Sequence, residues 1–327
     1  MENNWKDIIG AASGDEAHVL GKFLYFSLAN ILVDRQELSN LCENILGVEY
    51  KGGSRLSVSD AFRSATGDIR ERFSVRNGGG QNIYEVYCRD NKRDADKLSR
   101  ELVKETLNLH TNQYEKLANI HFDKANQSFG YDGVTPDEDV DALAFCRRAE
   151  DLFELYQRCA NRRQVETVCQ SYLRMLEATK VSVNGHLYFV PKHTMEKVDA
   201  FESFIEELNE RNRNDAPLTA NSFYIIDDAK QRDKMTEEFY LAVRKEIAEY
   251  QERADYLIKS GSRSPAILER WVLKIAALEE KKRHYESILR RELDGLDDEF
   301  GDLQLLSQEL TIRARGLRAK KNMAKAA

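Results

Sequence analysis

The chain has 327 residues and a formal net charge of −7; 32% of its residues are charged and 42% are hydrophobic. Its 14 Phe and 14 Tyr argue against a disordered chain. No apolar run approaches the roughly 20 residues that a membrane-spanning helix needs, so we expect no membrane protein. High charge with only 4 Pro and 17 Gly favours a largely helical protein.

Cytoplasmic localisation is the expectation from the cysteines and the amino terminus. The five cysteines are spread widely and contain no C-x-x-C pair, which suits a reducing compartment. The first four residues, Met1 to Asn4, lack the cationic start of a signal peptide.

Residues 15–46 show a helical spacing of apolar residues, which a Gly-rich stretch at 51–54 then breaks. Ser57 followed by Asp60 resembles a capping box and predicts that a second helix begins there. Its inner face would contain Val58, Ala61, Phe62, Ala65 and Ile69.

The segment 83–88, Ile-Tyr-Glu-Val-Tyr-Cys, predicts a strand because it is rich in aromatic and β-branched residues. Long helices are predicted over about 94–125 and 137–180, separated by a loop with Gly130, Gly133 and Pro136.

Asn184-Gly185 between two short apolar runs predicts a β-hairpin with a two-residue type I′ turn. A helix over about 198–208 follows Pro191, and the polar stretch 210–217 is the best candidate for a domain linker. Residues 222–227 predict one more strand.

The last third reads as two long helices. Apolar residues recur in steps of three and four from Met235 to Leu257, and again from Ile267 to Leu303. Gly261 and Pro265 separate the two runs, which predicts an antiparallel helical hairpin or a coiled-coil element for oligomerisation.

The predicted fold class is therefore mainly α with a small β element (α+β), with long helices, one Asn-Gly hairpin and a C-terminal helical hairpin. We expect a mostly helical domain at 1–210, a strand plus helical arm at 218–312, and a basic tail at 313–327.

The tail has six cations and no acid, and without them the formal charge of the first 312 residues is −13. The tail and the basic pairs of the second arm helix are candidates for contact with a partner or a nucleic acid, although interleaved acids favour salt bridges within the helix. The candidates are Lys281, Lys282, Arg283, Arg290, Arg291, Arg313, Arg315, Arg318, Lys320 and Lys321.

The sequence predicts no catalytic residues, no cofactor and no metal centre. The Gly-rich segment 76–82 lacks the Lys-Ser/Thr of a phosphate-binding P-loop, and no G-x-S-x-G occurs. None of the six histidines has the spacing of a zinc site, although His186 and His193 flank one predicted strand and could approach each other.

Two segments resemble known signatures. Residues 58–66, Val-Ser-Asp-Ala-Phe-Arg-Ser-Ala-Thr, resemble a V-D-A-F-R-x-A-T motif, and residues 185–191 resemble a G-x-Y-F-V-P motif, each with one additional residue. Together with the charged helical carboxyl end, they resemble an uncharacterised family of phage and bacterial mobile-element proteins. The residues that carry the resemblance are Asp60, Phe62, Arg63, Tyr188 and Phe189.

That family has no assigned activity, so the resemblance implies a setting and not a mechanism. The expected function is that of a non-enzymatic phage or mobile-element protein that acts by protein–protein contact. It would be an oligomeric inhibitor or modulator of a host complex, such as a defence complex. The alternative is a nucleic-acid-binding protein that uses the basic arm and tail.

Overall fold

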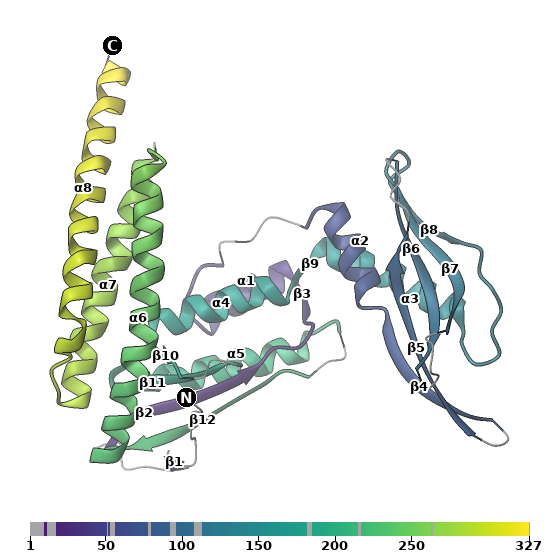
Figure 1. The fold of residues 1–327 in the computed structure, drawn as a ribbon, viewed down its shortest axis with the longest axis horizontal. Helices are drawn as coiled ribbons and strands as arrows, with labels where there is room; N and C mark the ends of the chain where they lie inside the picture. Colours follow the sequence, from purple (N-terminus) through teal and green to yellow (C-terminus); the bar gives the residue numbers. More distant parts are fainter. Residues whose placement is uncertain are drawn as a thin grey trace. The chain divides into compact units, whose positions relative to one another are not determined.

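The fold is described from a computed structural model of the chain (Figure 1). The structure describes residues 10–11, 18–50, 52, 56–77, 80–91, 96–107, 113–181, 185–214, 217–262 and 264–326. The chain forms two compact units. Unit 1 contains residues 1–27, 169–206 and 218–327, and unit 2 contains residues 28–168 and 207–217.

Unit 1 is built on an antiparallel five-stranded sheet whose central strand, β2, comes from the amino-terminal segment. Phe23 of β2 contacts the rings of Phe189 and Phe223 on the two neighbouring strands. Across the sheet the strands are β1 (Gly10–Ala11), β12 (Thr219–Ile226), β2 (Val19–Ser27), β11 (Leu187–Pro191) and β10 (Thr179–Lys180).

Gly21 allows β2 and β11 to lie unusually close. A Cβ atom at this position would lie 2.1 Å from the carbonyl oxygen of Val190. A backbone atom cannot move aside as the end of a side chain can, so this place in the sheet requires glycine.

Three long helices of unit 1 lie side by side (Figure 1): α6 (Ala229–Lys259), α7 (Pro265–Leu289) and α8 (Asp297–Ala326). The side chain of Asp228 caps α6, and Pro265 begins α7. Their apolar stripes form one core with residues of the sheet, which includes Phe189, Phe239 and Tyr285.

Shorter elements complete unit 1. Tyr172, near the end of α4 (Arg162–Met175), stacks on Phe201 of α5 (Val198–Glu210), and Phe201 also contacts Phe26 of β2. Between β11 and α5 runs a short 3-10 helix, η3 (Lys192–Lys197), and η4 (Asp294–Leu296) precedes α8.

Unit 2 contains a second antiparallel sheet in which five strands follow one another in chain order. The helices α2 and α3 pack on it, and the rings of Phe62, Phe129 and Phe153 meet in that core. The strands are β4 (Arg70–Asn77), β5 (Gly80–Asp90), β6 (Lys97–Thr106), β7 (Gln113–Asp123) and β8 (Ser128–Asp132); the helices are α1 (Arg35–Asn44), α2 (Val58–Gly67) and α3 (Ala142–Arg158); β3 (Leu32–Asp34) pairs with β9 (Cys159–Asn161).

The predicted fold class, mainly α with one small β element, is wrong. Two five-stranded antiparallel sheets make this an α+β protein with much more β structure than the sequence pattern indicates. The helix predicted over 94–125 is replaced by strands β6 and β7 wherever the structure describes that segment. The helix predicted from residue 15 is largely strand β2, and helix α1 begins only at Arg35.

The charged residues of β6 explain the first error. Lys, Arg, Glu and Leu favour helices, but here Glu101 of β6 bridges Arg89 of β5 and Lys116 of β7. Charged residues that the sequence pattern assigns to the solvated face of a helix therefore form ion pairs between neighbouring strands instead. In β2 the first six residues are all buried, so the strand lacks the alternation that identifies a half-exposed strand.

The single predicted hairpin is also wrong in detail. Strands β10 and β11 are antiparallel, but Thr179 pairs with Phe189 and Val181 donates to the carbonyl of Leu187. The connection is thus longer than the predicted two-residue turn, and Asn184 lies outside the described residues. In the C-terminal hairpin, the second predicted helix ends at Leu289, because Arg290 adopts a left-handed conformation with φ 51°, and α8 is a third helix.

Candidate functional site

The end of helix α4 presents a glutamate where helices usually place glycine. The amide of Ala178 donates to the carbonyl of Leu173, and the amide of Glu177 donates to the carbonyl of Arg174, which together form a Schellman ending. Glu177 occupies its left-handed position with φ 55°. A non-glycine residue there is strained by of order 1 kcal/mol or more, which directs attention to what the side chain does.

This strain gives a comparison that isolates the backbone. Glu177→Gly and Glu177→Ala both remove the carboxylate, but only glycine adopts φ 55° without a steric penalty. We expect the Gly variant to be more stable than the Ala variant by about 1 kcal/mol, as measured by urea denaturation. Equal stabilities would contradict the left-handed conformation.

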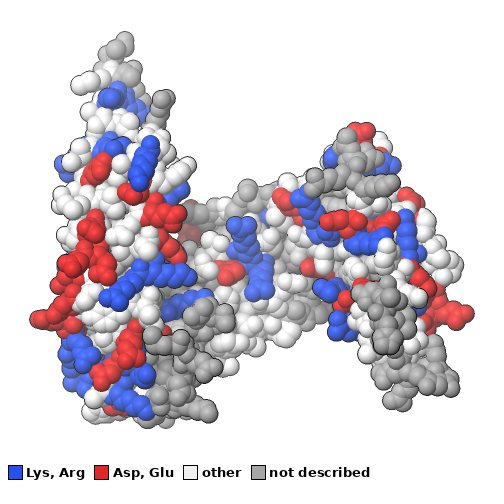
Figure 2. Space-filling view, viewed as in Figure 1, with Lys and Arg blue, Asp and Glu red and all other residues white. Residues whose placement is uncertain are grey.

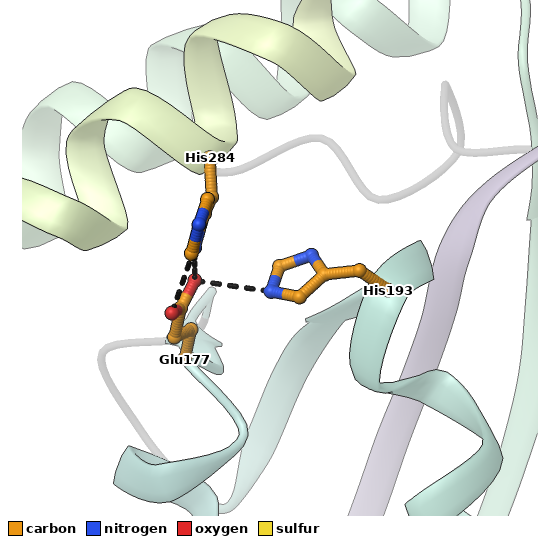
Figure 3. A group of neighbouring side chains, drawn as sticks. All are labelled: Glu177, His193 and His284. Carbon is orange, nitrogen blue, oxygen red and sulfur yellow. Dashed lines mark hydrogen bonds and ion pairs between the residues drawn. The ribbon is translucent and has the colours of Figure 1, made fainter.

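The carboxylate of Glu177 lies between two histidines from different elements (Figure 3). His284 Nδ1, on α7, is 2.8 Å from both carboxylate oxygens, and His193 Nε2, on η3, is 3.2 Å from Oε2. The two imidazole rings are 4.8 Å apart between centroids. One atom from each residue, a carboxylate oxygen and two ring nitrogens, can be chosen so that all three lie within 4.8 Å of one another.

The backbone around this histidine–carboxylate cluster (Glu177, His193 and His284) is fixed by buried hydrogen bonds. Tyr285 Oη donates to the carbonyl of Glu177 at 3.0 Å and accepts from Thr179 Oγ1 at 2.7 Å. Thr194 Oγ1 donates to the carbonyl of Leu176 at 2.8 Å, which ties η3 to the same turn. The three side chains of the cluster therefore project from elements that are already joined to one another.

The side chain of Lys281 lies next to the turn that contains Glu177. Its Nζ donates to the carbonyl of Ala178 at 3.1 Å and lies 3.7 Å from a carboxylate oxygen of Glu246. Burial lowers the pKa of Lys281, against the opposing attraction of Glu246 and Glu177. The site thus contains an enclosed lysine that stabilises the turn rather than a cation that faces solvent.

The cluster itself remains open to solvent. The side chains of His193 and His284 are 37% and 40% exposed, and that of Glu177 is 20% exposed. A small ion or a proton can therefore reach the carboxylate and both ring nitrogens. This is the set of described residues that offers metal-ligating atoms from three elements at once.

The predicted basic stripe of the arm is largely neutralised by acidic residues. Lys282 contacts Asp297 at 2.7 Å, and Arg318 contacts Glu269 at 2.5 Å. The other ion pairs are Lys281–Glu246, Arg283–Glu280, Arg290–Asp227, Arg291–Asp233 and Arg313–Glu309.

Arg315, Lys320 and Lys321 are exposed and have no ion pair within the described part of the chain. All three lie near the carboxyl end of α8. In Figure 2, cations gather toward that end of the helical layer, and acidic residues lie along its edge below them. These three are the predicted contact residues that stay available to a partner.

The same helix exposes large apolar residues. Leu305, Ile312 and Met323 are 65%, 70% and 72% exposed, although they lie on a helix whose opposite face enters the core through Phe300, Leu303, Leu310 and Ala314. We call the three exposed residues the outer stripe of α8.

The residues of the two sequence motifs lie on helix α2 of unit 2 and on strand β11 of unit 1. Ser57 caps α2 by accepting from the amide of Asp60, and Phe62 is buried in the core of unit 2. Arg63 is exposed on the same helix. In unit 1, Tyr188 stacks on Phe26, and Phe189 packs against Tyr285.

No activated nucleophile stands out among the cysteines. All five are free thiols, and burial raises the pKa of Cys146 to about 11 and, with a contribution from Glu43, that of Cys42 to about 11. Cys88 is raised further, to about 12, chiefly by burial. A thiol with such a pKa is protonated at neutral pH and is a poor nucleophile.

No sequence pattern points to the cluster. Glu177 is one of many acids, His193 follows it only after the intervening strands β10 and β11, and His284 comes from a distant part of the chain. His186, which the sequence suggested could approach His193, stacks on Phe26 with ring centroids 4.5 Å apart. The available signal is weak: a helix that ends in Leu-Glu-Ala without the usual glycine.

The sequence model of DUF6744, a family of unknown function, matches residues 19–316. The chain therefore belongs to this family. No curated protein and no solved structure matches the chain. Within the described residues, no helix is both long and apolar enough to cross a membrane.

Proposed function

We propose that this member of the DUF6744 family is a non-enzymatic protein that acts by protein–protein contact through the outward face of α8. A second copy of the chain is the proposed first partner. The observation that carries this proposal is the outer stripe of α8, since three large apolar side chains are left in water on one helix face.

The spacing of the stripe suits a helix partner. Leu305 and Ile312 are seven residues apart, the repeat that keeps a seam facing a neighbouring helix. With Leu303 and Leu310 buried on the other side, α8 has two apolar seams, and the described residues cover only one of them.

The charges of α8 favour an antiparallel copy. Its first turns contain the exposed acids Asp298 and Asp302, whereas its far end contains Arg315, Lys320 and Lys321. When Leu305 of one copy lies opposite Ile312 of the other, the same register places Asp302 opposite Arg315. A two-fold axis then makes the Asp302–Arg315 contact twice, as in a closed homodimer.

The first test is the mass of the full-length protein in solution. Light scattering should give twice the chain mass for the wild type and the chain mass for Leu305→Glu/Ile312→Glu, because charges in the seam cannot be buried. Leu273→Glu on α7 is the matched control, because Leu273 is also 70% exposed but lies on another helix. A wild type that is monomeric at high micromolar concentration would contradict the proposal.

Charge reversal tests the orientation. Asp302→Arg and Arg315→Asp should each weaken association at least about tenfold by placing like charges opposite each other. Mixing the two variants should restore a dimer, because each then supplies the charge that the other needs. In a parallel pairing Asp302 would already face Asp302 and Arg315 would face Arg315, so neither single reversal should weaken association.

The resemblance to phage and mobile-element proteins supports the biological setting of the proposal. In that setting, the dimer would bind a host complex and inhibit or redirect it. The five free thiols support the cytoplasm as the location. Binding of nucleic acid by the arm is less well supported, because acids of the same chain neutralise most of its cations.

A further inference from the structure

We propose that Glu177, His193 and His284 bind a divalent transition-metal ion of the zinc class. The ligating atoms would be a carboxylate oxygen of Glu177, Nε2 of His193 and Nδ1 of His284. Two imidazoles and one carboxylate form a common ligand set for such ions. This inference does not depend on contact through α8.

The distances suit one shared ion. Ligands about 2.0–2.2 Å from a tetrahedral zinc ion lie roughly 3.3–3.6 Å from one another. The carboxylate of Glu177 is 2.8 Å from His284 Nδ1 and 3.2 Å from His193 Nε2. To admit the ion, the Glu177 carboxylate has to move roughly 0.5–0.8 Å away from His284 Nδ1, and the three ligating atoms, now within 4.8 Å of one another, have to gather around it. The partly exposed side chains can make such shifts.

The carboxylate of Glu280 lies where the outer hydrogen-bond partner of a metal-bound His284 would be. His284 Nε2, the ring nitrogen that points away from Glu177, is 3.3 Å from Glu280 Oε1 one helical turn earlier. Metal-ligating histidines almost always donate their other N–H to such a group, which fixes the tautomer that leaves Nδ1 free to bind.

The strained backbone at Glu177 is independent support. A glycine at this helix end would relieve the strain, yet the position holds a glutamate whose carboxylate reaches both histidines. Strain of this kind is concentrated at ligand and metal sites, where the side chain is needed.

The ligand set selects the class of ion. Imidazole nitrogens suit Zn²⁺, Co²⁺, Ni²⁺ and Cu²⁺, whereas Mg²⁺ and Ca²⁺ prefer oxygen ligands throughout. Three protein ligands leave a fourth position for water or for a group of a bound partner. The ion would also cross-link α7, η3 and the end of α4, which are distant in the sequence.

The competing interpretation is a metal-free cluster in which protonated histidines form ion pairs with Glu177. The two interpretations differ in stoichiometric metal binding. Full-length protein treated with a chelator and then exchanged into metal-free buffer should bind one Zn²⁺ per chain in isothermal titration calorimetry. Co²⁺ should give the visible absorption bands of a tetrahedral site, and a millimolar excess of Mg²⁺ should not compete.

His193→Gln and His284→Gln should each lower the Zn²⁺ affinity by more than the 10–100-fold that is typical for loss of an outer partner, and Glu280→Gln should fall within that range. His121→Gln is the control, because His121 lies 3.5 Å from the carboxylate of Asp132, in a pair that no third metal-ligating side chain joins within the described segments. It should bind Zn²⁺ as the wild type does.

Absence of stoichiometric binding to the folded wild type would overturn the proposal. An equal loss of affinity in His121→Gln, or an unchanged affinity in both ligand variants, would also overturn it. Circular dichroism of each variant establishes that it is folded. If a glutamine variant is unfolded, the Co²⁺ spectrum of the wild type becomes the test. Bands of a tetrahedral site with imidazole ligands support the proposal, and their absence overturns it.

Discussion

A Lys104→Ala variant should lose about 3–5 kcal/mol of unfolding free energy, because it leaves a buried carboxylate without its counter-charge. Lys104 Nζ, on β6, lies 2.9 Å from both oxygens of Asp137 and 3.1 Å from Asp139 Oδ2. The side chains of Lys104 and Asp137 are each only 9% exposed. Urea denaturation followed by circular dichroism measures the loss.

Lys116→Ala is the matched control on the neighbouring strand. Lys116 also forms an ion pair, at 3.1 Å to Glu101, but its side chain is 43% exposed. Exposed pairs contribute about 0–1 kcal/mol, so the control should cost no more than that. A similar loss of unfolding free energy in both variants would show that the buried Lys104–Asp137 pair contributes no more to stability than an exposed pair.

The same pair predicts a pH window. Burial alone would raise the pKa of Asp137, but hydrogen bonds from Lys104 and from the amides of Asp139 and Val140 outweigh it, so the pKa lies below its ordinary value. Burial alone would lower the pKa of Lys104, but its bonds to Asp137 and Asp139 raise it.

A lowered carboxyl pKa stabilises the fold above the unfolded value, near 3.9, and this contribution disappears as the pH falls through the folded pKa. A raised lysine pKa stabilises the fold below about 10.4, and this contribution disappears as the pH rises through the folded pKa. The difference in unfolding free energy between wild type and Lys104→Ala should therefore be largest between about pH 4 and pH 10, and it should become smaller below and above that range. A difference that stays constant down to pH 2 would contradict this assignment.

Phe239→Ala is expected to cost about 3–5 kcal/mol through the cavity that it leaves in unit 1. Phe239 of α6 is fully buried, and its ring stacks on Tyr285 of α7 with centroids 4.2 Å apart. Tyr285 in turn contacts Phe189 of β11, so the cavity would open where two helices meet the sheet. Thermal and urea denaturation both report the loss.

Leu241→Ala provides the comparison on the same helix. Leu241 is 60% exposed, so its removal leaves no cavity and should change stability by less than about 0.5 kcal/mol. If Phe239→Ala cost equally little, the stacked Phe239–Tyr285 pair would not be part of a rigid core.

Local signals predicted the elements that depend on local physics. The capping residue Ser57 marks the start of α2, the segment 83–88 lies within β5, and the apolar stripe from Met235 to Leu257 is the buried face of α6. In each case, the residues that decide the structure are neighbours in the chain.

Elements that depend on distant partners could not be predicted in this way. Strand β2 becomes a strand because β11 and β12 pair with it from residues far along the sequence. The same holds for the site: Glu177, His193 and His284 meet only after the sheet and α7 are in place. The partners of the arm cations, such as Asp227 for Arg290, are likewise set by tertiary packing.

The division of unit 1 into three chain segments has a consequence for its biosynthesis. Strand β2 leaves the ribosome early, yet its neighbours β11 and β12 begin only at Leu187 and Thr219, roughly 170 and 200 residues later. At about 5–20 residues per second, these intervals last roughly 10–40 s. Unit 2 is complete by residue 217 and can fold during this time, whereas β2 is unpaired until β11 is synthesised and lacks its other neighbour until β12 follows. The nascent chain therefore exposes an aggregation-prone segment that only strands from residue 187 onward can cover.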